Sequence, residues 1–211
     1  LENKNYLFID LLLNDAKPGS FDILFKRSGK IESEYKYDLL ERDPGSMERK
    51  GFDPSDVIYL ITPDRYANGD QDNDTVEGLK EGYGRTKGRG RHGGDIQGII
   101  DHIDYIKDMG FTQLWINPLL ENDQEIYSYH GYSTTDYYKI DPRFGSNELY
   151  RSLSNIAQKN GIGIIMDLIL NHIGSEHWWM YDLPSSDWIN YGGTFVQTNH
   201  THHSIYDPHT P

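Results

Sequence analysis

Cysteine is absent from the 211 residues, and this absence excludes several kinds of chemistry at once. Without thiols there is no disulfide framework, no thiolate metal site and no thiol nucleophile. Basic residues are also few, because 20 Lys and Arg stand against 33 Asp and Glu, which gives a formal net charge of −13. Nucleic acid is therefore not expected as the main partner, since neutralising phosphates requires a basic surface. Long apolar runs are missing too, and none approaches the ~20 residues of a membrane span.

Aromatic residues, by contrast, are abundant: they make up 13% of the chain and include 16 Tyr and 4 Trp. Only 36% of the residues are hydrophobic, so many of these rings are expected on surfaces or in clefts rather than in the core. Rings with a polar edge suit partly wet sites. The composition thus hints at a surface for a carbohydrate or another flat ligand.

Residues 1 to 52 are predicted to be β structure. Strand-length runs at 6–13, 21–25 and 35–39 are separated by turn signals. Three strands are fewer than the about seven of a complete sandwich. We therefore expect this segment to be the C-terminal part of a β-sandwich (Ig-like) domain.

The pattern changes to βα units after Pro44-Gly45. Short apolar runs at 57–61, 114–116 and 162–169 are typical of parallel strands buried on both faces. Between them, helices are predicted from Asp95, as N-cap, to Met109, and over about 149–157. This order predicts an α/β fold. The loops after the first two strands are long enough to be functional, and they follow the strand ends where α/β folds place their sites.

The first long loop is rich in oxygen-bearing side chains. Residues 64–74 contain seven acidic or amide side chains, with Gly69 permitting a turn among them. Calcium takes 6–8 oxygen ligands, so several of these side chains could converge on one ion. A solvated acidic turn explains the same composition, because the spacing does not match the calcium loop of an EF-hand.

The same loop continues into a basic stretch, residues 84–95. Its four Lys and Arg residues among glycines are typical of RNA-contacting segments, but the acidic balance of the chain favours a solvated loop. Asp95 is a candidate helix N-cap, and beside the Gly93 carbonyl it could also close the ion site.

Two further groups follow the second and third strands. Five tyrosines at 127, 129, 132, 137 and 138 accompany His130 and Asp136, which suits either sugar stacking or an aromatic mini-core under the loop. The third strand is followed by Asn171 and His172. Strand alternation would place Asp167, Ile169 and Asn171 on one side.

These residues resemble a known family. The stretch 167–172, together with 130–132 and 141–145, resembles signature regions of the α-amylase family, glycoside hydrolase family 13. Loop 64–74 with 93–95 is similar to the calcium site of its neopullulanase and cyclomaltodextrinase branch. Residues 177–179 and 187–190 are similar to neopullulanases of bacterial starch-utilisation systems. The resemblance extends from about residue 57 to residue 211.

The resemblance implies a (β/α)₈ TIM barrel that hydrolyses α-1,4-glucans with retention, preceded by a β-sandwich domain. In this family the nucleophile, the acid/base and a third carboxylate follow the fourth, fifth and seventh strands. A barrel needs about 250 residues, so only the first three strands are expected here. The implied limits are 1–52 for the sandwich part, 53–174 for the barrel part and 175–211 for the start of an inserted domain. The chain alone is expected to be inactive.

The resemblance also implies residue roles. The positions that match substrate-binding residues of the family are His130, Tyr132, Asp167 and His172. Asp167 matches a residue that surrounds the substrate and not the nucleophile. Calcium is the implied cofactor, and the matching ligand positions are Asn68, Asp70, Asn73, Asp74, Gly93 and Asp95. Asn171 matches a position that binds a different calcium in many α-amylases.

The expected substrates are maltooligosaccharides, pullulan or cyclodextrins. The alternatives are a non-catalytic carbohydrate-binding module and a transglycosylase or isomerase of the same family. The expected partner is an α-glucan, with no nucleic acid and no membrane span, and oligomers are compatible with the resemblance. The family resemblance further implies a periplasmic or otherwise extracytoplasmic location, although residues 1–4 show no export signal.

The last segment carries more aromatic and imidazole side chains. Residues 178, 179, 188, 191 and 195 are aromatic candidates for lining a cleft, with core packing as the alternative. Histidines at 200, 202, 203 and 209 could ligate a transition metal, but their spacing favours a solvated loop.

Overall fold

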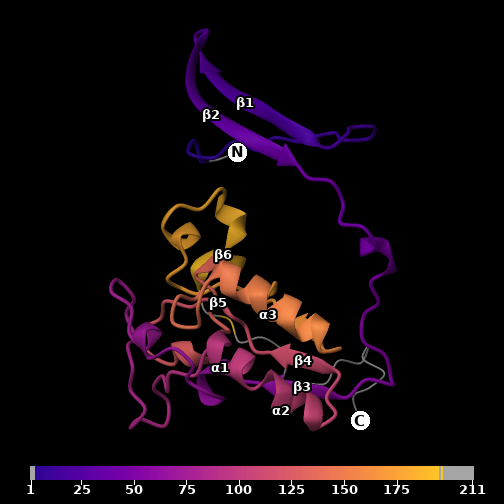
Figure 1. Ribbon diagram of the computed structural model, residues 1–211. Coiled ribbons are helices and arrows are strands. Elements are labelled where there is room, and N and C mark those ends of the chain that lie inside the picture. Colours follow the sequence, from indigo (N-terminus) through magenta and orange to yellow (C-terminus); the bar gives the residue numbers. More distant parts are fainter. Residues whose placement is uncertain (1–2, 195, 197–211) are drawn as a thin grey trace, which may run out of the picture. The chain divides into compact units, whose positions relative to one another are not determined.

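The structure is a computed structural model that describes residues 3–194 and 196 (Figure 1). It divides into two compact units. One is Phe8–Asp53, and the other joins the described residues up to Leu7 with those from Pro54 onwards. Among the described residues, no helix has both the length and the apolar character that crossing a membrane requires.

The unit Phe8–Asp53 contains one antiparallel hairpin. Its strands are β1 (Gly19–Arg27) and β2 (Lys30–Leu39), and Gly19 pairs with Leu39 at the open end. Ser28 and Gly29 both have positive φ angles, of 50° and 80°, as a tight two-residue hairpin turn requires. The strands predicted at 21–25 and 35–39 lie within this hairpin, so those two predictions are confirmed.

The strand predicted at 6–13 is wrong. These residues have no regular secondary structure, and side chains such as Leu12, which is 87% exposed, are solvated. An apolar run forms a strand only where a neighbour supplies backbone partners, and no described strand pairs with this one.

The other unit is built on a three-stranded parallel sheet. Its strands are β3 (Ile58–Ile61), β4 (Gln113–Ile116) and β7 (Gly163–Met166), hydrogen-bonded in the order β3-β4-β7. Leu60 is level with Trp115, and Trp115 with Ile165. Figure 1 shows β3 and β4 side by side.

One face of this sheet is buried against the helices, which are α1 (Ile96–Asp101), α2 (Ile103–Asp108) and α3 (Asn147–Lys159). Leu114 and Ile116 of β4 belong to the same buried apolar cluster as Ile99 and Leu153 from the helices. The opposite face is open, since Leu60 is 52% exposed and Trp115 is 41% exposed. Parallel sheets are normally covered on both faces, and in the (β/α)₈ barrel that the resemblance implies, the face away from the helices points into the barrel.

The helix predicted from Asp95 to Met109 is interrupted at His102, where φ is −112° and ψ is 13°. The ring nitrogen Nδ1 of His102 lies 2.8 Å from the carbonyl oxygen of Gly98, which in a continuous helix accepts the backbone N–H of His102. That N–H bonds to Ile99 instead, which tightens the turn and ends α1. The predicted ends are confirmed: the Asp95 side chain caps the Gly98 N–H at 2.6 Å, and Gly110, with φ 84°, follows α2.

The third strand is shorter than predicted. β7 ends at Met166 because its neighbour β4 ends at Ile116, and Pro118 follows there without a backbone N–H. Residues 167–170 are irregular, so the expected alternation of Asp167, Ile169 and Asn171 along a strand is wrong.

The second long loop contains a small ribbon that the sequence did not predict. β5 (Leu120–Glu121) and β6 (Asp136–Ile140) pair antiparallel. Short 3₁₀ turns complete the described chain, at Ser46–Glu48, Pro63–Arg65, Gln71–Asn73, Ser128–His130, Trp178–Tyr181, Ser186–Trp188 and Asn190–Gly193.

A buried ion pair fastens the two long loops together. Arg143 donates to Asp141 at 2.7 Å, and both side chains are fully buried. Arg143 also donates to the backbone oxygens of Glu81 at 2.6 Å and Asn122 at 2.9 Å. Burial alone would raise the pKa of Asp141, but the hydrogen bond from Arg143 and the charges of Arg91 and Arg143 outweigh it and hold that pKa below its usual range.

Candidate functional site

The carboxylate of Asp167 lies directly after β7, between two donors. Trp115 Nε1, from β4, donates to Asp167 Oδ2 at 3.0 Å, and the Tyr132 phenol donates to the same oxygen at 3.0 Å. Burial and the bond to Asp167 raise the pKa of Tyr132, so its hydroxyl stays protonated and remains a donor. Among the described residues Oδ1 of Asp167 has no hydrogen-bond partner, which leaves it available to accept from a ligand.

His130 lies next to this pair. Its Nδ1 accepts the backbone N–H of Tyr132 at 2.9 Å, and the two rings are 5.8 Å apart. Burial lowers the pKa of His130, and the charge of Glu81 opposes that shift only in part. The imidazole is therefore neutral at pH 7, with its proton on Nε2, where it can donate to a hydroxyl group.

His172 is engaged by the protein through both ring nitrogens. Nε2 lies 2.8 Å from the backbone oxygen of Tyr132, and because a carbonyl can only accept, Nε2 carries the proton. Nδ1 lies 3.3 Å from Nδ2 of Asn171. To bind a sugar hydroxyl, this ring would have to exchange one of these two bonds.

Tyr132 is the residue that brings the four predicted substrate residues together. Its hydroxyl contacts Asp167, its backbone N–H contacts His130 and its carbonyl contacts His172. Gly131 precedes it with φ 81°, and a Cβ there would clash with the carbonyl oxygen of Pro118. Only glycine therefore allows the loop to approach the end of β4 so closely.

Trp115 was not identified from the sequence as a residue of this site. The alternation of β4 contains the signal, because Leu114 and Ile116 are buried while Trp115 between them faces the open side of the sheet. What the sequence could not show is that this side also carries the carboxylate of Asp167.

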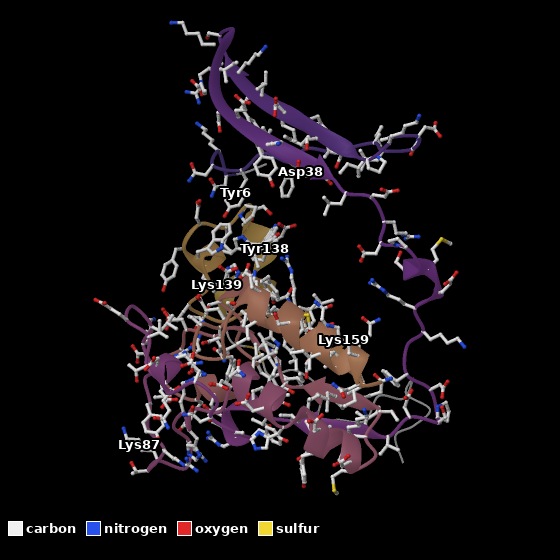
Figure 2. The ribbon with its side chains drawn as sticks, viewed as in Figure 1. Tyr6, Asp38, Lys87, Tyr138, Lys139 and Lys159 are labelled. Atoms are coloured by element: carbon white, nitrogen blue, oxygen red, sulfur yellow. The ribbon has the colours of Figure 1, made fainter. Side chains whose placement is uncertain are left out.

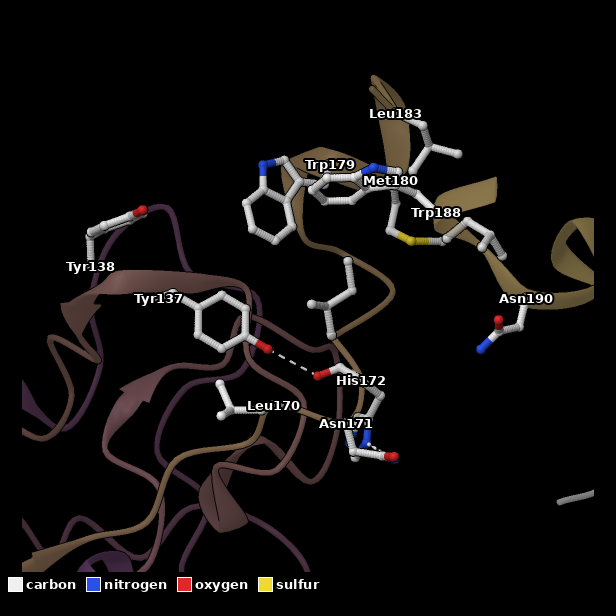
Figure 3. A pocket seen from close by; sticks show the side chains of 12 residues that line it. Tyr137, Tyr138, Leu170, Asn171, His172, Trp179, Met180, Leu183, Trp188 and Asn190 are labelled. Atoms are coloured by element: carbon white, nitrogen blue, oxygen red, sulfur yellow. Dashed lines mark hydrogen bonds between the residues drawn. The ribbon is translucent and has the colours of Figure 1, made fainter. Parts of the chain in front are cut away.

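A cavity of about 600 Å³ lies beside His172 (Figure 3). Its lining includes Asn171, Trp179, Trp188 and Asn190. Two of the predicted cleft-lining aromatics, Trp179 and Trp188, thus face a cavity.

The other aromatic and imidazole candidates do not line that cavity. Trp178 stacks on Tyr6 at 6.4 Å, and Tyr191 is 69% exposed. Residue 195 and histidines 200, 202, 203 and 209 lie outside the described residues.

The acidic loop is organised around Asp95. Its carboxylate accepts the backbone N–H groups of Gly69 at 3.1 Å and Asp70 at 2.8 Å, in addition to its helix-capping bond. It also accepts from Nδ2 of Asn73 at 3.2 Å. Asp95 thus folds the loop back on the start of α1.

Oxygen atoms without donors remain in this loop. The side-chain oxygens Oδ1 of Asn68 and Asn73 are buried and have no hydrogen-bond partner. Asp74 accepts from Asn68 Nδ2 at 2.8 Å, and burial raises the pKa of Asp74, an effect that the Asn68 bond opposes and the charges of Asp95 and Asp70 reinforce. Buried acceptors beside a carboxylate that is costly to ionise fit a hard cation such as calcium.

The backbone of Gly93 approaches the same group. Its φ is 85°, and a Cβ at this position would clash with Asp74 Oδ1 and come within 2.6 Å of Asn68 Nδ2. The loop and residues 93–95 are thus packed as one unit. Within residues 3–194 and 196, no three His, Asp or Glu side chains converge on a metal position, so a cation here would depend on the amide oxygens.

The basic stretch, residues 84–95, contains both buried and exposed basic side chains. Arg91 is buried, with its guanidinium 4.6 Å from the Phe144 ring, and burial lowers the pKa of Arg91 to about 10. Arg65, from the start of the same loop, lies 3.9 Å over the ring of Tyr129. Lys87, labelled in Figure 2, is exposed to solvent.

Comparisons with known proteins agree with this architecture. Residues 60–209, more than half of the chain, match the family described as alpha amylase, catalytic domain. Residues 1–43 match the N-terminal domain of cyclomaltodextrinase.

Curated relatives match over part of their length. A cyclomaltodextrinase of Thermoanaerobacter pseudethanolicus is 38% identical over 141 residues, which are 64% of this chain and 24% of the relative. Neopullulanase 2 of Thermoactinomyces vulgaris is 39% identical over 123 residues, 57% of this chain and 20% of the relative. The chain therefore spans about a quarter or less of these proteins.

Solved structures show the same fold. An alpha-amylase of Geobacillus thermoleovorans, in complex with acarbose, superposes with a TM-score of 0.51 at 35% identity, covering 63% of this chain and 27% of the amylase. The cyclomaltodextrin glucanotransferase CldA superposes with a TM-score of 0.53 at 37% identity, covering 57% of this chain and 26% of that enzyme.

The sequence-based prediction of family and fold class is thus confirmed. The three parallel strands with helices on one face are the beginning of a (β/α)₈ barrel, and the hairpin before them belongs to the β domain that precedes it. The chain belongs to the α-amylase family of glycoside hydrolases and combines part of its catalytic domain with a cyclomaltodextrinase-type N-terminal domain.

Proposed function

We propose that this chain is part of a retaining α-glucan hydrolase that cleaves α-1,4-glucosidic bonds in maltooligosaccharides, pullulan or cyclodextrins. The observation that supports it best is the group formed by Tyr132, Asp167 and His130 at the ends of β4 and β7. It offers an aromatic face, a carboxylate oxygen to which no described residue donates, and a neutral imidazole donor. These are the groups that bind the apolar face and the hydroxyls of a pyranose ring.

In this proposal these residues orient the sugar and do not react with it. Retaining hydrolysis needs a carboxylate nucleophile and a carboxylic acid about 5–5.5 Å apart. Both are proposed to lie outside these 211 residues, as family resemblance implies. The Tyr132 ring would stack on the sugar at the cleavage point, while Asp167 Oδ1 and His130 Nε2 hold its hydroxyls. Contacts of this kind accelerate the reaction when they strengthen in the transition state.

Calcium is the proposed cofactor. The ligand positions are Asn68, Asp70, Asn73, Asp74, Gly93 and Asp95, and the buried, unpartnered amide oxygens of Asn68 and Asn73 support the assignment. When bound, calcium supplies positive charge that offsets the neighbouring carboxylates. It would act on the fold of the first long loop, not on the glucan directly.

The test is an assay of the full-length protein on maltooligosaccharides, pullulan and cyclodextrins, with the anomeric form of the first product followed by NMR. The proposal expects release of the α-anomer, and release of the β-anomer or no turnover would contradict it. The 211-residue chain is expected to be inactive in the same assay, so turnover by this chain alone would contradict the assignment of the catalytic carboxylates.

A second candidate is transglycosylation, which the likeness to CldA, a cyclomaltodextrin glucanotransferase, favours. Incubation with a labelled maltooligosaccharide acceptor distinguishes the two. A hydrolase releases labelled acceptor unchanged, whereas a transferase lengthens it. If the isolated chain bound maltooligosaccharide in a calorimetric titration and the full-length protein had no activity, a non-catalytic binding module would be the better description.

The proposed location is the periplasm or another extracytoplasmic compartment, as the family resemblance implies. Fractionation of cells that produce the full-length protein, followed by immunoblotting, tests it. Recovery in the cytoplasmic fraction alone would contradict this location.

A further inference from the structure

The hydroxyl of Tyr137 is aimed at the irregular segment that follows β7. Its Oη lies 2.8 Å from the backbone oxygen of Ile169 and 3.0 Å from that of His172, and the second bond is drawn in Figure 3. A phenol has one hydrogen to donate, so the two carbonyls share it. Tyr137 belongs to β6, whereas both acceptors come from the chain beyond β7.

The ring of Tyr137 is fixed by aromatic neighbours. It stacks on Trp179 with centroids 6.1 Å apart, and it lies 5.8 Å from His177, which is 1% exposed. His177 is itself held, because its Nδ1 accepts the backbone N–H of Trp179 at 3.1 Å. Trp179 in turn packs edge-on against Trp188 at 5.2 Å. The hydroxyl therefore projects from a packed aromatic group.

The segment it touches lies beyond the last paired residue of β7. The pairing of β7 with β4 ends at Met166, and residues 167–170 have no regular structure. Yet this segment leads from Asp167 to His172, two of the proposed substrate residues. His172 then donates from Nε2 to the backbone oxygen of Tyr132 at 2.8 Å. The position of the imidazole thus depends on where its backbone is held.

We propose that Tyr137 is a positioning residue, whose hydroxyl holds the backbone at Ile169 and His172 so that the His172 ring meets Tyr132 in the glucan-binding group. The inference rests on the proposed function for its catalytic consequence, but the geometry it describes does not. Tyr137 acts here through His172, although its ring also lines the cavity beside His172. Burial raises the pKa of Tyr137, which keeps the hydroxyl protonated and able to donate over the working pH range.

The variant Tyr137→Phe separates this role from simple packing. It keeps the ring on Trp179 and His177 and removes only the donor to the two carbonyls. The matched control is Tyr105→Phe, in α2, where the side chain is 55% exposed and its hydroxyl has no hydrogen-bond partner among the described residues.

Two measurements on the full-length protein test the proposal, both at a temperature at which circular dichroism shows the variants folded. In steady-state assays with a maltooligosaccharide, Tyr137→Phe is expected to lower kcat/KM about tenfold, mainly through kcat, while Tyr105→Phe stays within twofold. In protein labelled with ¹⁵N-histidine, the His172 signals are expected to move from a fixed Nε2–H tautomer to an averaged imidazole in Tyr137→Phe only.

The outcomes separate the two levels of inference. Unchanged His172 signals in Tyr137→Phe would overturn the positioning role, whatever the activity. Altered His172 signals with unchanged kinetics would overturn the catalytic consequence. If the wild-type protein hydrolyses no α-glucan, the proposed function fails, and the NMR comparison still decides whether Tyr137 positions His172.

Discussion

The Tyr132 phenol donates to Asp167 Oδ2 across 3.0 Å and thereby joins the long loop after β4 to the end of β7. The two residues are 35 positions apart in the chain. Because Trp115 donates to the same oxygen, Oδ2 is held by two donors, and Oδ1 has no hydrogen-bond partner among the described residues.

Removing the hydroxyl group of Tyr132 should slow glucan turnover. In the full-length protein, Tyr132→Phe retains the ring and loses a hydrogen bond to a charged group, which is worth about 1.5–3 kcal/mol. We expect kcat/KM for a maltooligosaccharide to fall at least tenfold.

Trp115→Phe should have a similar effect, and the double variant should lose less than the sum, because both donors act on one oxygen. Tyr129→Phe serves as the control, since its ring stays beneath Arg65 and its hydroxyl has no partner among the described residues. Additive losses from the two variants would contradict a shared role.

Calcium should stabilise the chain through Asp74. At 100 times its Kd, a ligand adds about 2.7 kcal/mol to the free energy of unfolding, which raises Tm by about 5–10 °C. Chelator should remove that gain from the wild type. Asp74→Asn should abolish calcium binding in a calorimetric titration.

In chelator, Asp74→Asn should be no less stable than the wild type. The raised pKa of Asp74 means that its ionised form is costly in the folded state without a cation, and an amide avoids this cost. Asp72→Asn, in the same loop but exposed, should behave as the wild type. A chelator effect that persists in Asp74→Asn would argue against this site.

Glycine is required at position 93 and not at position 88. Gly93→Ala adds a Cβ that clashes with Asp74 and forces a left-handed φ of 85° on alanine, which costs about 1–2 kcal/mol. We expect lower thermal stability and at least tenfold weaker calcium binding. Gly88→Ala is the matched control in the same loop, because a Cβ there meets nothing within 4 Å. Equal calcium affinity in the two variants would show that Gly93 does not shape the site.

The Asp141–Arg143 pair should make the fold resistant to mild acid. Breaking a buried pair costs about 3–5 kcal/mol, so Asp141→Asn should lower the free energy of unfolding by an amount of this order in urea titrations. Asp101→Asn, which removes an exposed carboxylate whose one hydrogen bond within the described residues is to Gln97, should change it by less than about 0.5 kcal/mol.

The sign of the pH dependence follows from the lowered pKa of Asp141. The folded state releases this proton more readily than the unfolded chain, so the stabilisation is complete above the unfolded pKa of about 3.9. It is lost as pH falls from there through the lower folded pKa. The stability difference between wild type and Asp141→Asn should therefore be constant from pH 7 to about pH 5 and shrink below pH 4. A difference that shrinks near neutral pH would contradict the assignment.

Much of the barrel part was predictable because its signals are local. Apolar runs and i, i+3, i+4 spacing indicated the strands and helices, and the short carboxylate of Asp95 indicated where α1 begins. The failures have a common cause. His102 ends α1 by bonding a carbonyl with its side chain, and β7 ends where its neighbour ends, so neither boundary is visible in a hydrophobic pattern.

The sequence by itself determined the family, the order of the three parallel strands with helical segments between them, and the kinds of side chain in the two long loops. Propensity, capping and periodicity act over a few residues, and motifs can be read without coordinates. Only the tertiary structure decided which atoms meet: that Trp115 and Tyr132 donate to one oxygen of Asp167, that Asn68 and Asn73 keep buried oxygens without donors, and that Tyr137 reaches the backbone beyond β7. Such contacts join residues that are distant in sequence, and they depend on how the loops fold back over the strand ends, which no local pattern specifies.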